Sequence, residues 1–217
     1  MGQLTILDLI SDGNLYKSDD VVLTDTFDCS GCSFCCEDMC DSIIIDPYDL
    51  YALEKGLHKD FNALIDEGYL ELGLHNLLML PHIKNNGNGC SFLTEEKRCG
   101  IHDIRPGICR LFPLGRYYHD ETFSYILQNR GCKLENKGSI KVRDWLNIPE
   151  LEKYEAFENR WHYFIKGLSN LIMENKDHDE KEQIIDSVLN TFYRSDYDTV
   201  SDFYDQIYSR MQHSHLL

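Results

Sequence analysis

The stretch Asp28-Cys29-Ser30-Gly31-Cys32-Ser33-Phe34-Cys35-Cys36 places four thiols within eight residues, at the spacing C-x2-C-x2-C-C. A thiolate is a nucleophile and a metal ligand, so gathering four without a cation costs charge repulsion and oxidative risk. Two intervening residues let both sulfurs of a pair turn toward one centre, as in zinc knuckles and ferredoxins. We therefore predict a metal centre, with a structural disulfide cluster as the alternative.

The adjacent pair Cys35-Cys36 is the less usual part of this stretch. Neighbouring side chains diverge, and they rarely reach the same metal atom. The pair therefore suggests two metal positions or a polynuclear cluster rather than one closed tetrahedral site.

A second group of cysteines follows at Cys90, Cys99 and Cys109, separated by eight and nine residues. This spacing favours ligands carried by a hairpin and by the turn after it. Pro106 can open a short helix with Cys109 on its first turn, where a helix N-terminus stabilises thiolate charge. Arg105 and Arg110 bracket this thiol, and we predict that they bind the cofactor by offsetting the charge of an anionic cluster.

Composition narrows the functional class. The chain has 217 residues and nine cysteines, and its 21 basic against 37 acidic side chains give a net charge of −16. Such a chain repels phosphate backbones, so we expect no nucleic-acid partner. No apolar run approaches the roughly 20 residues that span a bilayer, and the N-terminus lacks the pattern of a secretory signal, so we expect a cytoplasmic protein without membrane contact. In that compartment cysteines indicate metal or redox chemistry before disulfides.

The remaining pattern predicts an α+β fold with a small cysteine-rich core and a mostly helical C-terminal extension. Residues 1–27 are expected to form short strands or a loose wrap, 42–45 a buried strand, and 72–89 a loop. Helices are expected from Asp46-Pro47 and after Asp60, and a hairpin over 115–127 with an acidic turn. The predicted domains are residues 1–140, which bind metal, and 141–217, with helices near 157–172, 180–193 and 199–212 packed on the first domain.

The ordered motifs resemble one family closely. They are Cys29-x2-Cys32-x2-Cys35-Cys36, Cys90-Ser91-Phe92-Leu93, Cys99-Gly100-Ile101-His102, Arg105-Pro106-x2-Cys109-Arg110 and a final Cys132. This string is similar to the CxxCxxCC family of zinc- or iron-chelating proteins, which includes YkgJ-type cysteine-cluster proteins and the flagellin lysine N-methylases. The resemblance covers about residues 28–132.

The resemblance implies a set of metal ligands. It maps eight thiols onto the family pattern, and these are Cys29, Cys32, Cys35, Cys36, Cys90, Cys99, Cys109 and Cys132. Cys40 falls outside the pattern and is read as a small buried residue or spare thiol. His102 stands where the family commonly has tyrosine, and we interpret it as a hydrogen-bonded aromatic replacement rather than a ligand.

Three hypotheses of function remain open. The first is an enzyme in which a cluster supports S-adenosylmethionine-dependent lysine N-methylation or redox modification of a protein or peptide substrate. The second is a binding protein that stores, senses or transfers metal. The third is a structural zinc module that presents a partner surface. Because a C-x2-C-x2-C triad with a distant fourth cysteine is closer to ferredoxin ligation, we favour an iron–sulfur cluster, 4Fe-4S in type, over zinc.

Overall fold

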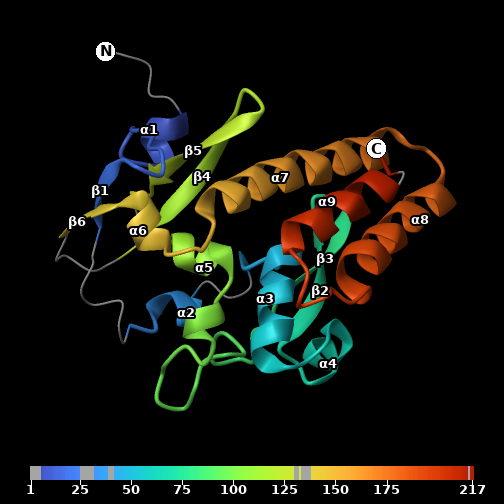
Figure 1. The fold of residues 1–217 in the computed structure, drawn as a ribbon, viewed down its shortest axis with the longest axis horizontal. Coiled ribbons are helices and arrows are strands. Elements are labelled where there is room, and N and C mark those ends of the chain that lie inside the picture. Colours follow the sequence, from blue (N-terminus) through green and yellow to red (C-terminus); the bar gives the residue numbers. More distant parts are fainter. Residues whose placement is uncertain (1–5, 25–31, 39–41, 130–131, 133–137, 215) are drawn as a thin grey trace. The chain divides into compact units, whose positions relative to one another are not determined.

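The computed structural model describes residues 6–24, 32–38, 42–129, 132, 138–214 and 216–217 (Figure 1). Short antiparallel hairpins are combined with helices that dominate the C-terminal part, which confirms the predicted α+β class. The described strands form three two-stranded sheets, which pair β1 with β6, β2 with β3, and β4 with β5. None of the helices in the described ranges is long and apolar enough to cross a membrane.

The contacts divide the chain into two compact units that interleave along the sequence. Unit 1 contains residues 1–32 and 107–159, and unit 2 contains residues 33–106 and 160–217. The long helix α7, Leu151–Glu174, contributes its residues 151–159 to unit 1 and the remainder to unit 2. The sequence predicts a boundary between residues 140 and 141, which would separate a metal-binding domain from its helical extension. This boundary stays a prediction.

Unit 1 is built around two small sheets. Strand β1 (Val21–Thr24) pairs antiparallel with β6 (Gly138–Lys141), and β4 (Leu114–His119) pairs with β5 (Thr122–Leu127). The second pair is the predicted hairpin, and its turn residues Asp120 and Glu121 both have positive φ, as the twist of a tight hairpin requires. Short helices α1 (Ile6–Ile10), α5 (Gly107–Leu111) and α6 (Val142–Leu146) complete the unit. The segment around residues 6–10 is therefore helical rather than a strand or loose wrap.

In unit 2 the first helices begin where the sequence predicts. The side chain of Asp46 accepts a hydrogen bond from the Asp49 amide at 2.8 Å, and α3 runs from Pro47 to Leu57. Asp60 caps α4 (Phe61–Asp66) in the same way, through the Ala63 amide at 2.7 Å. Each cap satisfies an amide that the helix itself leaves without a partner.

The expected loop over residues 72–89 is wrong in its first half. Residues Leu70–His75 form β2 and Leu78–Ile83 form β3, and the two strands pair along their whole length. The predicted strand at 42–45 is an isolated bridge from Ile44 to His82, flanked by a 2.9 Å hydrogen bond from the Ile45 amide to the Pro81 carbonyl. This segment therefore adds an extended edge to β3 and buries Ile45 completely.

The C-terminal helices of unit 2 follow the predicted apolar spacing. They are the second part of α7, then α8 (His178–Leu189) with a π-helical turn η3 (Asn190–Arg194), and α9 (Phe203–His213). Their aromatic residues meet in the core, where the Trp161 ring lies 5.1 Å from Phe192 in an edge-to-face arrangement. Burying such side chains contributes about 1.5–3 kcal/mol each, which is why these helices are stable without a role in chemistry.

Candidate metal centre

Two of the clustered cysteines lie on one short helix of unit 2. Helix α2, Phe34–Asp38, carries Cys35 and Cys36. Ser33 precedes the helix and is hydrogen-bonded to its first turn. The Ser33 carbonyl accepts a hydrogen bond from the Cys36 amide at 2.8 Å, and its hydroxyl donates one to the Glu37 carboxylate at 2.9 Å. Lys97 then pairs with Glu37 at 3.1 Å. The helix is thus tied to the loop that precedes Cys99.

Cys90 is delivered to this helix by the glycine–asparagine loop, as the sequence predicts. Side chains of Asn85 and Asn86 accept amide hydrogen bonds two residues on, at 2.9 and 3.0 Å. The Cys90 amide donates to the Cys36 carbonyl at 2.7 Å. Gly89 has φ +119°, and a Cβ placed there would lie 2.6 Å from the Cys36 carbonyl oxygen. Glycine is therefore needed for Cys90 to approach Cys36.

Cys99 reaches the same place from the following turn. A bridge joins Leu93 to Cys99, and the Thr94 amide donates to the Arg98 carbonyl at 2.8 Å, which makes the predicted hairpin. The Cys99 thiol shares a hydrogen bond with the Cys36 thiol. This contact, and then burial, raise the pKa of Cys99 far above its usual range, against the opposing effects of the Ile101 amide and the Arg105 charge.

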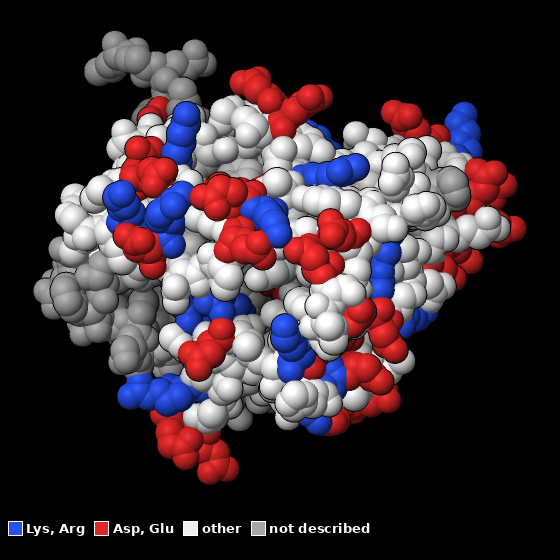
Figure 2. Space-filling view, in the orientation of Figure 1, with Lys and Arg blue, Asp and Glu red and all other residues white. Residues whose placement is uncertain are grey.

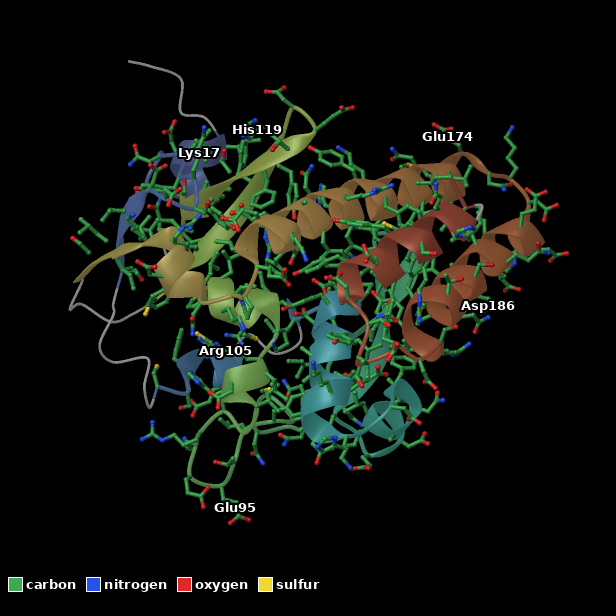
Figure 3. The ribbon with its side chains drawn as sticks, in the orientation of Figure 1. Lys17, Glu95, Arg105, His119, Glu174 and Asp186 are labelled. Atoms are coloured by element: carbon green, nitrogen blue, oxygen red, sulfur yellow. The ribbon has the colours of Figure 1, made fainter. Side chains whose placement is uncertain are left out.

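Arg105 follows the short 3-10 helix η2, His102–Ile104, and is labelled in Figure 3. Its Nη1 atom donates to the His102 carbonyl at 2.7 Å and lies within 3.0 Å of both ring nitrogens of His102. The guanidinium charge acts to lower the pKa of Cys99, but the Cys36 contact and burial outweigh it, so the net pKa of this thiol is raised. His102 is 56% exposed, and its ring faces Arg105.

Unit 1 holds the other predicted ligands that the structure describes, Cys32, Cys109 and Cys132. Cys109 lies on α5 beside Arg110, in the predicted short helix, which begins at Gly107 rather than Pro106. Cys29 and Cys40 lie outside the described residues. Among the cysteines that the structure describes, none forms a disulfide.

A buried polar network that the sequence did not reveal supports α5. Arg116 on β4 pairs with Glu158 on α7 at 2.7 Å, and it also donates to the Tyr154 hydroxyl at 2.8 Å. Tyr154 in turn donates to Glu158, and its hydroxyl lies where a Cβ on Gly107 would be. An arginine within an aromatic strand pattern is the signal that could have pointed to this network.

The described thiols come together in pairs rather than as a complete site. Cys36 contacts Cys99 through the thiols and Cys90 through the backbone. Within the part of the chain that the structure describes, no group of three or more His, Cys, Asp or Glu side chains is arranged to hold a metal ion. The chemistry of the donor set nevertheless fits a thiophilic metal, because a cation would replace the shared thiol proton and neutralise two adjacent sulfurs.

A comparison with known protein families identifies what the cysteine-containing segment is similar to. Residues 28–133 match the family model CxxCxxCC, described as a "putative zinc- or iron-chelating domain". This segment of the chain is similar to that domain. The resemblance drawn from the cysteine spacing is thereby confirmed. No curated protein and no solved structure matches the chain significantly.

Proposed function

We propose that this chain binds a metal centre through cysteine thiolates, and that the centre is an iron–sulfur cluster of the 4Fe-4S type. The observation that carries the proposal is the contact between the thiols of Cys36 and Cys99, which come from separate segments of unit 2, with Cys90 held to Cys36 through its backbone amide. A protein gains nothing in core packing from directing two thiols at each other, whereas two thiolates are half of a four-sulfur ligand set.

The proposed ligands are the eight thiols of the CxxCxxCC pattern. They are Cys29, Cys32, Cys35, Cys36, Cys90, Cys99, Cys109 and Cys132. Arg105 and Arg110 are proposed to offset the negative charge that the thiolates bring. The charge of Arg105 already acts on Cys99 in this sense. When bound, an iron–sulfur cluster supplies electron transfer or a polarising iron atom to the residues around it.

Zinc is the alternative metal, and the family description includes it. Four thiolates satisfy zinc as well as an iron–sulfur cluster, and a zinc site would have a structural, metal-transfer or partner-binding role without catalysis. The C-x2-C-x2-C spacing followed by distant cysteines favours iron–sulfur. An activity in S-adenosylmethionine-dependent lysine N-methylation of a protein or peptide is supported by the family resemblance alone.

Anaerobic purification followed by analysis for iron, zinc and acid-labile sulfide tests the proposal. An iron–sulfur protein has iron and sulfide in matching amounts and a broad absorption band that is bleached by reduction. Stoichiometric zinc with a colourless protein would establish the alternative metal. Protein without either metal, purified under these conditions and refractory to reconstitution, would refute metal binding.

Paired cysteine variants locate the centre. Cys99→Ala is expected to lower bound metal at least about tenfold, because the thiolate that faces Cys36 is lost. Cys40→Ala is the matched control, since Cys40 lies outside the family pattern, and it should retain the metal content of the wild type. Equal metal content in the two variants would contradict the assignment of Cys99 as a ligand.

A further inference from the structure

The β2–β3 hairpin carries two histidines and a glutamate on one face. Its register pairs Glu71 with His82 and Gly73 with Leu80, so that Glu71, Gly73 and His75 lie on the same face as His82. The two imidazole rings are 5.4 Å apart between centroids and nearly perpendicular, at 75°. The cysteine chemistry described above uses none of these side chains.

The nitrogen atoms of the two rings are unevenly satisfied. Nε2 of His82 lies 3.3 Å from a carboxylate oxygen of Glu71, which favours the tautomer with the proton on Nε2. Nδ1 of His82 and Nε2 of His75 are buried and have no hydrogen-bond partner among the described residues. A buried polar atom without a partner is unfavourable, so a ligand for these two nitrogens would be stabilising.

Both nitrogens face the same small space. A Cβ built on Gly73 would lie 2.9 Å from Nδ1 of His82 and 3.3 Å from Nε2 of His75. The atom nearest to that Cβ is Cε1 of His82, at 2.7 Å, so the absence of a side chain at residue 73 is what lets the two rings come this close over the strand.

We propose that His75 and His82 bind a divalent transition-metal ion of the zinc or nickel class over Gly73, separately from the cysteine centre. Nε2 of His75 and Nδ1 of His82 are the ligand atoms, and bonds of about 2.0–2.1 Å to nitrogen suit such ions. Glu71 holds the ring of His82 in the tautomer that presents Nδ1. With two protein ligands, water or a small molecule completes the coordination.

Titration of the full-length protein with Ni²⁺, with its cysteine-bound metal already in place, tests the proposal. Calorimetry is expected to show one additional equivalent bound, with shifts in the His75 and His82 ring resonances. The variants His75→Gln and His82→Gln should each weaken this binding by more than the roughly tenfold expected for Glu71→Gln. Gly73→Ala keeps both imidazoles but fills the space between them, and it should also abolish binding.

Two controls separate this site from other causes. His178→Gln removes an imidazole that is 82% exposed on α8, and it should leave the extra equivalent unchanged. Cys99→Ala should lose cysteine-bound metal and still take up Ni²⁺ at the histidines. A wild-type protein that takes up no extra Ni²⁺ would overturn the proposal, because the two nitrogens would then be bridged by water only. Unchanged binding in both histidine variants would overturn it equally.

Discussion

At the scale of single residues, Glu54 on α3 has a carboxyl group whose burial makes ionisation unfavourable. Burial raises its pKa to about 7, helped by the negative charges of Asp196 and Asp60 and opposed by the Phe61 amide and Arg210. In the unfolded chain this carboxyl has its ordinary pKa of 4.5, so the folded protein holds one more proton than the unfolded chain between pH 4.5 and about 7. Stability is therefore expected to fall as pH rises through this window and to level off above it.

Glu54→Gln should remove this dependence. The glutamine amide keeps an acceptor for the Phe61 N–H and carries no charge. We therefore expect the variant to be more stable than the wild type at pH 8. The expected gain is about 1–2 kcal/mol, which is less than the full pKa shift would give because solvent screens the partly exposed carboxyl. Urea unfolding between pH 4.5 and 8 measures this effect. Glu174→Gln, at an exposed position (Figure 3), is the control. An unchanged pH slope in Glu54→Gln would contradict the assignment.

Gly107 is a position where one added carbon atom would disturb the packing. Its Cα faces the Tyr154 hydroxyl so closely that a Cβ would overlap it, and Tyr154 is fixed by Arg116 and Glu158. Gly107→Ala should therefore destabilise the protein by about 1–3 kcal/mol in urea unfolding. Gly167→Ala is the matched comparison, since its Cβ meets the end of the Leu217 side chain and alanine favours helix α7. A Gly107→Ala variant as stable as Gly167→Ala would show that the contact is dispensable.

At the scale of elements, the turn of the β2–β3 hairpin is strained. Asn76 and Leu77 have φ values of +49° and +68°, which is the type I′ pattern that favours Asn-Gly. A leucine side chain in the left-handed region costs about 1–2 kcal/mol, so Leu77→Gly should stabilise the protein by about 0.5–1 kcal/mol. Leu74→Gly, at an exposed position inside β2, should destabilise it by a similar amount. The same sign of change in both variants, measured by thermal unfolding, would contradict this account.

The elements that could be predicted from the sequence are those whose caps and turns have typical residues. Helices α3 and α4 were predictable because Asp46 and Asp60 are strong caps, and the hairpin of β4 and β5 because aromatic strands flank a short acidic turn. The hairpin of β2 and β3 was missed, since leucine stands where glycine marks such turns and Pro81 lies within the second strand. The alternation from Leu70 to His75 was the available signal.

The site was predictable in its residue types and less so in its contacts. Spacing alone identified the cysteines and the loop that delivers Cys90. The contact between the thiols of Cys36 and Cys99 depends on tertiary closure over residues 36–99, which no local pattern encodes. His75 and His82 were assigned to a loop, so their approach across a strand pair could not be foreseen.

At the scale of the whole molecule, the chain combines an acidic surface with cysteines that are spread along the sequence. Figure 2 shows acidic side chains spread over the visible face among fewer basic ones, in keeping with the net charge of −16. Such a surface attracts cations. The cysteines of the family pattern are spread over residues 29–132, so loss of metal is expected to affect residues far apart in the sequence.

Thiol protection measured by mass spectrometry tests metal binding by cysteine most directly. Metal-loaded and chelator-treated proteins are alkylated briefly under native anaerobic conditions, and modification is quantified at each cysteine. We expect the eight thiols of the CxxCxxCC pattern to be protected in the loaded protein and to become reactive after chelation, whereas Cys40 should react alike in both. Identical modification of all nine cysteines with and without metal would contradict it.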